Sequence, residues 1–446
     1  MESSMDDLFN WAVASGAHFS ASLLTISSGS RGRGVFASQD IPSSTLLLKL
    51  PFALAVRPHS CLKELVSDNK CSALLALILT VLRELFVNPT PSPSFTDLKN
   101  SKTPSIPSSW STKKLADICG TSLLPTPLTV NDVVKTRAAA FETDVLPLLP
   151  LLEEHYIPAI HLTLPNFQTA LSWVVSRALQ GRLNYELNTG NLWPYLGTDG
   201  PPTATTRHGE NGMFLLPLFD LINHSTDAKE RCTTLSVCED GSGWEMHTHR
   251  AVRKGEEILQ GYGQHGGAEL LRNYGFVERS DLTKVLVTVE QVLEANPGCD
   301  AGRVEKMREA GILPIGDLYQ LGSEPTTNLI TAIQVLVMSE EEYEVWIEVD
   351  CIMMGAEYLE EENTSDVVKG LLRLADGMSE RIGVGEGLGG LLKDEERRVV
   401  RDFKKNCVEL AWGGEGGDEG EEDEEEEEEE GDDEEAEQDG KKRKLK

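Results

Sequence analysis

Residues 219–225 read FDLINHS, and further along residues 255–258 read GEEI, followed by the pair Tyr262-Gly263. An Asn-His pair next to a tyrosine at a strand edge supplies backbone acceptors, one amide side chain and a phenol. These groups suit holding a sulfonium cofactor against an amine. They supply neither a metal cage nor an activated nucleophile.

The length and composition fit a protein with two or three domains. The chain has 446 residues, of which 40% are hydrophobic, which is enough to build real cores. No stretch reaches the roughly 18 to 20 apolar residues that a membrane span needs, and the apolar run 73–82 is expected to be a buried helix. Residues 1–7 are acidic and lack the basic and apolar regions of a signal peptide. We therefore expect an intracellular protein, in the nucleus, the cytoplasm or both, with no membrane partner.

The cysteine and histidine patterns indicate no metal site. The eight cysteines are scattered without a Cys-x-x-Cys pair, so we expect reduced core residues rather than a disulfide framework or a zinc cluster. His247 and His249 have strand spacing and share a face, but no third ligand stands near them. We assign no metal.

The net charge of −32 is unevenly distributed. Residues 413–440 hold 19 acidic side chains and no basic one, while residues 441–446 (KKRKLK) hold five basic ones. The remaining 412 residues are also acidic. An acidic body argues against direct nucleic-acid binding and favours a basic polypeptide partner, such as a ribosomal protein or a histone tail.

The acidic tail, residues 413–446, cannot bury enough apolar surface to fold, so we expect it to be disordered. It is either a solubilising end or a device that captures a basic substrate electrostatically. The final basic hexamer is either a nuclear localisation signal or a merely solvated end.

The hydrophobic pattern predicts an α+β fold. A helix from residue 6 or 7 to 15 is expected first, then strands 23–26 and 45–50 around the Gly-x-Gly of residues 32–34. Because that Gly-x-Gly lies between strands and not before a helix, a Rossmann domain is disfavoured. Helical periodicity is found at 72–86, 131–149 and 166–179, and Pro-, Gly- or Ser-rich stretches predict a mobile loop at 88–111 and a second loop at 188–212.

The second half of the chain changes character at about 280–295. Short strands are predicted before that point at 215–218, 233–237, 244–252 and 257–260, with a helix at 268–274. Beyond it the pattern is helical, with amphipathic runs at 329–338, 341–360, 366–378 and 393–412. We thus predict a β-rich domain over 1–285 with a helical insertion at about 60–210, an all-α domain over 286–412 and the tail 413–446.

Five sequence blocks in a fixed order carry a resemblance to a known family. They are GRGVFA at 32–37 with DI at 40–41, SRA at 176–178, DLINH at 220–224, EEI at 256–258 with YG at 262–263, and AELL at 268–271 with YGFV at 274–277. In these blocks the chain resembles SET-domain lysine methyltransferases of the Rubisco large-subunit type, which include fungal ribosomal-protein lysine methyltransferases. The resemblance covers roughly residues 10–280 and implies an inserted iSET-like helical region. The helical C-terminal segment resembles that family's substrate-binding domain.

The resemblance implies a site for S-adenosyl-L-methionine. Arg177 would contact the cofactor's carboxylate, a role suited to a guanidinium. Asp220 would support the turn that holds Asn223 and His224, which would bind the cofactor through backbone and amide contacts. The other implied roles are as follows: Gly32, Arg33 and Gly34 line the pocket, with the backbone of Arg33 at the amino-acid end, and Phe276 packs on the adenine.

Two tyrosines are implied to form the catalytic pocket, Tyr262 at its centre and Tyr274 as a wall of the lysine channel. Methyl transfer from a sulfonium needs a neutral amine in line with the S–CH3 bond, so positioning should dominate over acid-base catalysis. Lysine, with a reference pKa of roughly 10.4, is mostly charged at pH 7. An apolar channel walled by Tyr262, Tyr274 and Phe276, beside a cationic cofactor, would lower that pKa.

The sequence therefore predicts a monomeric, S-adenosylmethionine-dependent protein-lysine N-methyltransferase that acts on a basic protein. A histidine acceptor is a variant of this hypothesis. The alternative from another class is a non-catalytic module that binds a basic protein. One departure from the family concerns the cofactor region: many relatives have Ser-Asn where this chain has Gly266-Gly267, which removes an Asn that could cap the following helix.

Overall fold

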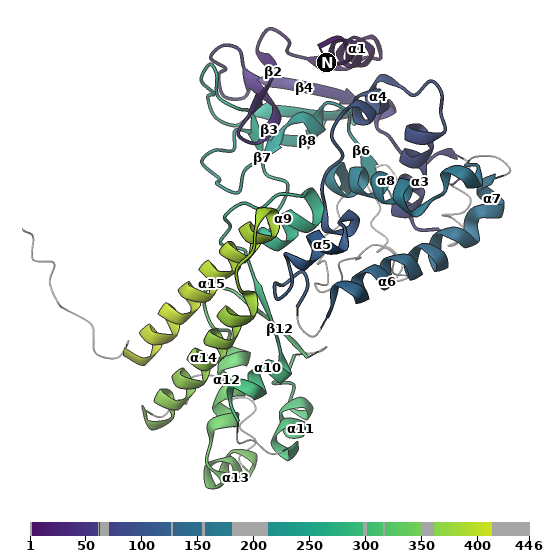
Figure 1. Ribbon diagram of the computed structural model, residues 1–446. Helices are drawn as coiled ribbons and strands as arrows, with labels where there is room; N and C mark the ends of the chain where they lie inside the picture. Colours follow the sequence, from purple (N-terminus) through teal and green to yellow (C-terminus); the bar gives the residue numbers. More distant parts are fainter. Residues whose placement is uncertain are drawn as a thin grey trace, which may run out of the picture.

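The computed structural model of the chain describes residues 2–60, 62, 71–125, 128–153, 157–180, 213–297, 301–314, 317–348 and 361–412. The predicted tail 413–446, the loop 188–212 and the end of the run 341–360 lie outside these residues. Figure 1 shows a broad part with strands and helices, from which a narrower helical part extends. Within the described residues, no helix combines the length and the apolar character that crossing a bilayer requires.

A four-stranded antiparallel sheet joins the beginning of the chain to residues more than 180 positions later. Its order is β1 (His18–Phe19), β4 (Leu46–Pro51), β9 (Gly243–Thr248) and β8 (Thr233–Val237). Helix α1 (Glu2–Ala14) belongs to the same part of the molecule (Figure 1). Leu48 and Leu50 of β4 and Trp244 and Met246 of β9 are buried in one core with period-two spacing. Leu47 is buried there as well, because the register of β4 against β9 shifts at this point.

Three of the sequence blocks meet beside this sheet. Strands β2 (Leu24–Gly29) and β3 (Gly32–Ala37) form an antiparallel hairpin, so the Gly-x-Gly is part of a strand and does not lie between strands as predicted; the prediction that it does not precede a helix is confirmed. The other edge of β3 bonds residues 256–258: Ala37 N donates to Glu256 O over 2.9 Å and Ile258 N to Val35 O over 2.7 Å. Strand β7 (Asn223–His224) pairs in parallel with β10 (Leu259–Gln260).

Helices α3 (Ala73–Phe86) and α8 (Leu164–Arg177) pack against each other and form the core of the inserted region. Ser72 caps α3 by accepting a hydrogen bond from Leu75 N, and Thr163 caps α8 in the same way through Asn166 N. The predicted helix 166–179 ends at Arg177, because residues Ala178–Gln180 form β5, which pairs with β6 (Met213–Leu215).

The prediction of a mobile loop at 88–111 is wrong. Residues Pro93–Asn100 form α4, and Pro107–Ser109 form a 3-10 turn. Pro93 occupies the first turn of α4, where its missing N–H costs nothing, and Phe95 and Leu98 are buried. Proline and serine content indicated a loop, whereas tertiary burial and the ion pair of Asp97 with Arg33 stabilise a helix here.

The predicted run 131–149 is helical with local irregularity, and one short helix that was not predicted precedes it. Helix α5 (Thr112–Ala116) is followed by α6 (Val130–Ala140), which begins with a capping box between Thr129 and Asp132. The chain then continues through a π-helical turn (Phe141–Val145) and a 3-10 turn (Leu146–Leu148) into α7 (Leu149–Glu153).

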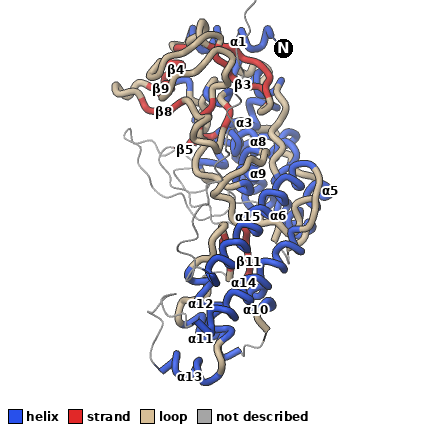
Figure 2. Tube along the Cα trace, turned by 90° about the vertical axis from the view of Figure 1, so that its left-hand side faces the viewer, coloured by secondary structure: helices blue, strands red, loops and turns tan. Residues whose placement is uncertain are grey.

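The C-terminal part is mostly helical, but the prediction that it is all-α is wrong. Strands β11 (Val285–Thr288) and β12 (Leu318–Leu321) form an antiparallel pair. Val285, Val287 and Leu321 from this pair are buried in the same core as the helices, so burial favours the β conformation. The helices are α10 (Val289–Ala295), α11 (Ala301–Glu309), α12 (Thr327–Val337), α13 (Glu340–Glu348), α14 (Glu361–Ile382) and α15 (Gly387–Trp412). Figure 2 shows this part as an elongated extension.

Helix α15 attaches the C-terminal part to the remainder through two adjacent buried glutamates. Glu396 Oε1 accepts hydrogen bonds from the backbone N (2.9 Å) and the hydroxyl of Ser122. Glu395 Oε1 accepts from Ser280 N and from the hydroxyl of Thr283, each over 2.9 Å. These contacts fix the position of α15 against residues 280–283.

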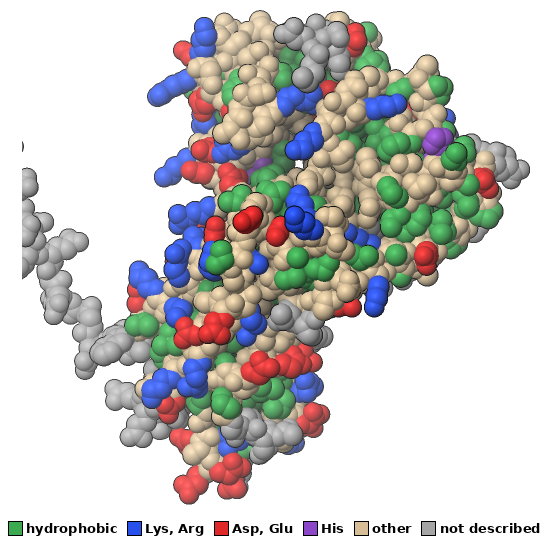
Figure 3. All heavy atoms as spheres, viewed as in Figure 1, with side chains coloured by type: hydrophobic (Ala, Val, Ile, Leu, Met, Phe, Trp, Pro, Cys, Tyr) green, Lys and Arg blue, Asp and Glu red, His purple; other side chains and the backbone are tan. Residues whose placement is uncertain are grey.

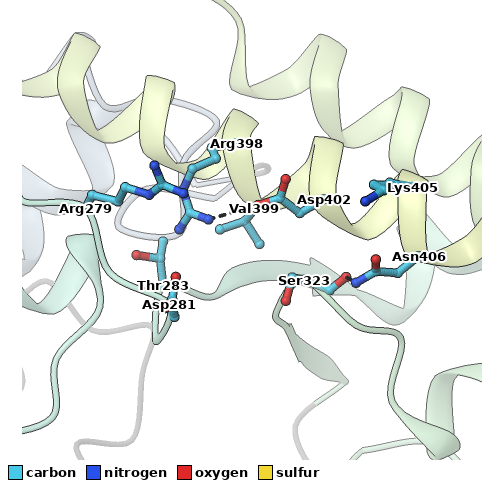
Figure 4. A pocket seen from close by; sticks show the side chains of 9 residues that line it. All are labelled: Arg279, Asp281, Thr283, Ser323, Arg398, Val399, Asp402, Lys405 and Asn406. Carbon is cyan, nitrogen blue, oxygen red and sulfur yellow. Dashed lines mark hydrogen bonds and ion pairs between the residues drawn. The ribbon is translucent and has the colours of Figure 1, made fainter. Parts of the chain in front are cut away.

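A cavity of about 290 Å³ lies next to this attachment (Figure 4). Its lining mixes cationic and anionic side chains: Arg279, Asp281, Thr283, Ser323, Arg398, Val399, Asp402, Lys405 and Asn406. Arg398 donates to Asp402 over 2.9 Å, and Asn406 donates to Ser323 O over 3.0 Å. The cavity thus spans the contact of α15 with residues 279–283 and with Ser323, which follows β12.

Candidate functional site

Aromatic rings from β7 and from residues 262–276 form one cluster. Helix α9 (Gly267–Tyr274) places Tyr274 at its last position, and Gly275, with φ of 82°, ends the helix and turns the chain toward Phe276. The ring centroids of Tyr262 and Tyr274 lie 4.8 Å apart, and those of Tyr274 and Phe276 lie 6.1 Å apart. The structure therefore brings together the three residues that were expected to wall the lysine channel.

His224 lies against this cluster and is neutral. Its ring centroid is 5.0 Å from that of Tyr262 and 6.0 Å from that of Phe276. Tyr262 N donates a 3.0 Å hydrogen bond to His224 Nδ1, so the ring proton belongs on Nε2. Burial, together with the charge of Arg231, lowers the pKa of His224 to about 4. Nε2 is buried and has no hydrogen-bond partner in the described part of the chain.

The hydroxyl of Tyr262 is also fixed. It donates to Ile222 O over 2.8 Å, the carbonyl just before Asn223. Burial raises the pKa of Tyr262 above its usual value, so the group stays a phenol across the physiological range. Tyr262 is thus an oriented hydroxyl and not a base.

Arg177 and Asp220 form an ion pair beside the cluster. Arg177 is the last residue of α8, and its Nη1 donates to the carboxylate of Asp220 and, over 3.2 Å, to the Asp220 carbonyl. The guanidinium lies over the ring of Trp173, 4.8 Å from its centroid. Asp220 thereby holds Arg177 in place, a pairing that the sequence pattern did not indicate.

The glycine-containing block lies directly against Asn223. Asn223 Nδ2 donates to Arg33 O over 3.1 Å and to Glu257 Oε1 over 2.8 Å. Gly34 is required by this contact, because a Cβ atom at position 34 would lie 2.4 Å from Glu257 Oε1 and 2.7 Å from Asn223 Nδ2. Gly32 has φ of 93°, a conformation that favours glycine. Arg33 and Gly34 therefore adjoin Asn223.

Several charged residues around the site escaped the sequence analysis. The side chain of Arg33 forms a paired ion contact with Asp97 of α4, with N–O distances of 2.9 and 2.8 Å. Arg31 lies 2.6 Å from a carboxylate oxygen of Glu230, 3.3 Å from Glu278 and 3.8 Å from Glu257. Glu257 belongs to one of the sequence blocks that carry the resemblance, but no role was predicted for it. Asp97 could not be predicted from the local sequence, because its partner Arg33 is 64 positions away.

The first glycine of the pair at the start of α9 has a steric explanation. A Cβ atom at position 266 would lie 2.7 Å from Leu282 O and 2.7 Å from Thr283 Cα, so there is no room for the Ser of many relatives. At position 267, where those relatives have Asn, a Cβ atom would lie 3.1 Å from Glu395 Cγ, so the structure gives no comparable reason for Gly267. Glu269 Oε2 accepts from Gly266 N over 2.9 Å and satisfies the start of the helix. Within the described ranges, no group of three or more His, Cys, Asp or Glu side chains is placed to hold a metal ion.

The comparison with protein families agrees with this geometry. The model of the SET domain matches residues 32–263, more than half of the chain. The chain belongs to the SET-domain family. The matched SET segment begins at Gly32 and ends just after Tyr262, so Tyr274 and Phe276 follow it.

Individual relatives of this SET-domain chain are distant. It is 25% identical over 301 residues to a fructose-bisphosphate aldolase-lysine N-methyltransferase of Arabidopsis thaliana, covering 64% of this chain and 55% of the relative. It is 24% identical to the ribosomal lysine N-methyltransferase set11 of Schizosaccharomyces pombe, covering 60% and 59%. The match thus spans little more than half the length of these relatives.

Solved structures confirm the fold of the SET domain and of the region that follows it. A structure of Rubisco LSMT bound to AdoMet superposes with a TM-score of 0.59 at 16% identity, over 92% of this chain and 93% of that one. A structure of the SET domain of LSMT bound to lysine and AdoHcy gives the same TM-score at 15% identity and the same coverage. The predicted resemblance and α+β SET fold are therefore confirmed.

Proposed function

We propose that this SET-domain protein is an S-adenosyl-L-methionine-dependent protein-lysine N-methyltransferase. The observation that carries the proposal is the convergence of the Arg33 backbone, Asn223, His224 and the Tyr262–Tyr274–Phe276 cluster at one place. Relatives named as lysine N-methyltransferases of aldolase and of ribosomal protein support it.

The donors and acceptors of the site fit S-adenosylmethionine. Both amide protons of Asn223 are used internally, which leaves Oδ1 as an acceptor for the cofactor's α-ammonium group. Arg177, held by Asp220 at the edge of the aromatic cluster, offers a cation for the α-carboxylate. The ring of Phe276 offers an apolar face for the adenine, and Gly32 leaves open space at the start of β3. When bound, the cofactor supplies a methyl group on a sulfonium.

The residues of this chain would orient the amine rather than deprotonate it. The Tyr262 hydroxyl donates its hydrogen bond to Ile222 O, so the lone pairs of its oxygen are available to accept a hydrogen bond from the amine. His224 is neutral, and the raised pKa of Tyr262 keeps that side chain uncharged. The aromatic walls would exclude water and favour the neutral amine, which loses its proton to solvent before transfer. Tyr262 and Tyr274 are thus assigned catalytic positions by this proposal.

The substrate we propose is a basic protein, either a ribosomal protein or a histone-like one. Figure 3 shows acidic side chains gathered at the end of the helical extension, where α13 begins with three consecutive glutamates. With a net charge of −32, the molecule attracts cationic partners and repels nucleic acid. We also propose that the chain is divided into a SET domain (1–285), a substrate-binding domain (286–412) and the acidic tail (413–446). The protein is proposed to act as a monomer, in the nucleus or the cytoplasm.

The test is to incubate the purified protein with isotopically labelled S-adenosylmethionine and a lysate of its own cells, and to identify labelled peptides by mass spectrometry. Label on lysine in one protein, absent with Tyr262→Phe, is expected. Label on histidine would show that the acceptor residue is histidine and not lysine. If no peptide is labelled in the presence of the cofactor, and a basic protein from the lysate is retained on the immobilised chain, the result would support the non-catalytic binding module instead.

A further inference from the structure

The two glutamates of the GEEI block make different contacts, and only one of them points toward the site. Glu256 pairs with Arg250 and accepts a 3.1 Å hydrogen bond from Arg253 N, which stabilises a turn. The side chain of Glu257 is 9% exposed and lies between β3 and β7. The catalytic proposal gives Glu257 no role.

The position of Glu257 follows from strand register. Phe36 and Glu257 are opposite each other in an antiparallel bridge, flanked by the bonds from Ala37 N to Glu256 O and from Ile258 N to Val35 O. Opposed residues project to the same face, and so do residues two apart on one strand. The carboxylate of Glu257 is therefore directed over Gly34, where the missing Cβ leaves room for it.

In that position Glu257 determines which way the amide of Asn223 faces. Glu257 Oε1 accepts from Asn223 Nδ2 over 2.8 Å, and Arg33 O accepts the other amide proton over 3.1 Å. An ionised carboxylate and a carbonyl can only accept, so a reversed amide would place Oδ1 against two acceptors. Arg31, 3.8 Å from Glu257 Oε2, offsets the charge of the carboxylate.

We propose that Glu257 is a positioning residue that orients Asn223 so that Oδ1 receives the α-ammonium group of S-adenosylmethionine. This inference rests on the proposed function. A reversed Asn223 would turn its NH2 group toward the cationic ammonium and oppose binding. Glu257 itself does not touch the cofactor.

The test is a double-mutant cycle on S-adenosylmethionine affinity, measured by isothermal titration calorimetry. Glu257→Leu removes the acceptor at similar volume and is expected to weaken binding about 10- to 100-fold. In the Asn223→Ala background the same substitution is expected to change affinity less than about threefold, because the amide it orients is gone. Glu257→Gln, which keeps an acceptor oxygen, should remain within about fivefold of the parent chain.

Controls separate this role from a structural one. Glu256→Leu, at the neighbouring position, should leave cofactor affinity unchanged, and unfolding temperatures are compared for all variants. Equal effects of Glu257→Leu with and without Asn223, or equal loss in Leu and Gln variants, would overturn the inference. Absence of binding to the unmodified chain would overturn the proposed function itself.

Discussion

The hydroxyl of Tyr262 donates a 2.8 Å hydrogen bond to the carbonyl oxygen of Ile222, one residue before Asn223. This bond couples the tyrosine to the turn that carries Asn223 and His224. Because the hydroxyl proton is used, the Tyr262 oxygen can act toward an amine only as an acceptor. The bond thus defines a role for Tyr262 that depends on its oxygen and not on its ring.

Tyr262→Phe keeps the ring and removes this oxygen. We expect kcat for lysine methylation to fall about 100-fold, as for the loss of one oriented polar group in an active site. The dissociation constant for S-adenosylmethionine should change less than about threefold, because ring packing with Tyr274 is kept. Tyr319→Phe is the matched control: Tyr319 is a buried tyrosine of the C-terminal core whose hydroxyl has no hydrogen-bond partner in the described structure. Unchanged turnover in Tyr262→Phe would refute the assignment.

Arg177→Ala should weaken cofactor binding without unfolding the chain. We expect a loss of about 10- to 100-fold in affinity for S-adenosylmethionine, because the carboxylate would lose a charge-assisted contact. Arg177→Lys should recover only part of it, since an ammonium cannot contact Asp220 and a ligand carboxylate in the same planar geometry. Calorimetric titration checks both, and an Arg177→Ala variant with the parent affinity would exclude the carboxylate role.

The sequence was sufficient to predict which residues gather at the site, but not the contacts that hold them. The blocks around Gly34, Asn223 and Tyr262 have local signatures, and a strand was predicted at 257–260, just before Tyr262. The strands that carry Gly34 (β3) and Asn223 (β7) were not predicted. The Arg33–Asp97 pair depends on α4 folding back over 64 positions, which no local pattern encodes. Strand β12 was missed for a similar reason, because its partner β11 lies about 30 residues away and burial between the helices decides its conformation.

Asp97→Asn tests the tertiary origin of α4. Asp97 is buried and binds Arg33 through two hydrogen bonds, so we expect the free energy of unfolding to fall by about 1–2 kcal/mol. Asp240→Asn is the control, because Asp240 is exposed, lies 3.8 Å from Lys49 and accepts a hydrogen bond from Ser242 N that an asparagine oxygen can keep; its effect should be clearly smaller than that of Asp97→Asn. Urea unfolding measures both, and similar shifts in the two variants would contradict a specific role for the Arg33 pair.

Deleting residues 413–446 should weaken the capture of the protein substrate without changing its turnover. If the tail attracts a basic substrate, its removal raises KM for the protein substrate several-fold at low salt, while kcat at saturating substrate stays within about twofold. Added salt should reduce the difference between the two chains. Steady-state kinetics at two ionic strengths provide the measurement, and an equal loss in kcat and in kcat/KM would contradict electrostatic capture.

The attachment of α15 should weaken as pH rises, because of Glu396. Burial raises the pKa of Glu396 from 4.5 to about 8, against the opposing effect of the Ser122 hydrogen bonds. Between these two values the folded chain holds a proton that the unfolded chain releases, so stability falls with rising pH by up to about 1.4 kcal/mol per unit. Glu396→Gln removes this titration and keeps an acceptor for Ser122. Its free energy of unfolding should exceed that of the parent chain at pH 8, and the difference should shrink toward about pH 5.

The neighbouring Glu395 provides a control of opposite sign. Burial alone would raise its pKa, but hydrogen bonds from Arg398, Ser280 and Thr283 outweigh burial and lower it below 4.5. The stabilisation from Glu395 is therefore present above its unfolded pKa and is lost as pH falls through the folded one. Glu395→Gln should destabilise the chain most at neutral pH and least in acid. Urea unfolding between about pH 3 and 8 compares the two variants, and a pH-independent difference for Glu396→Gln would show that Glu396 is ionised in the folded chain.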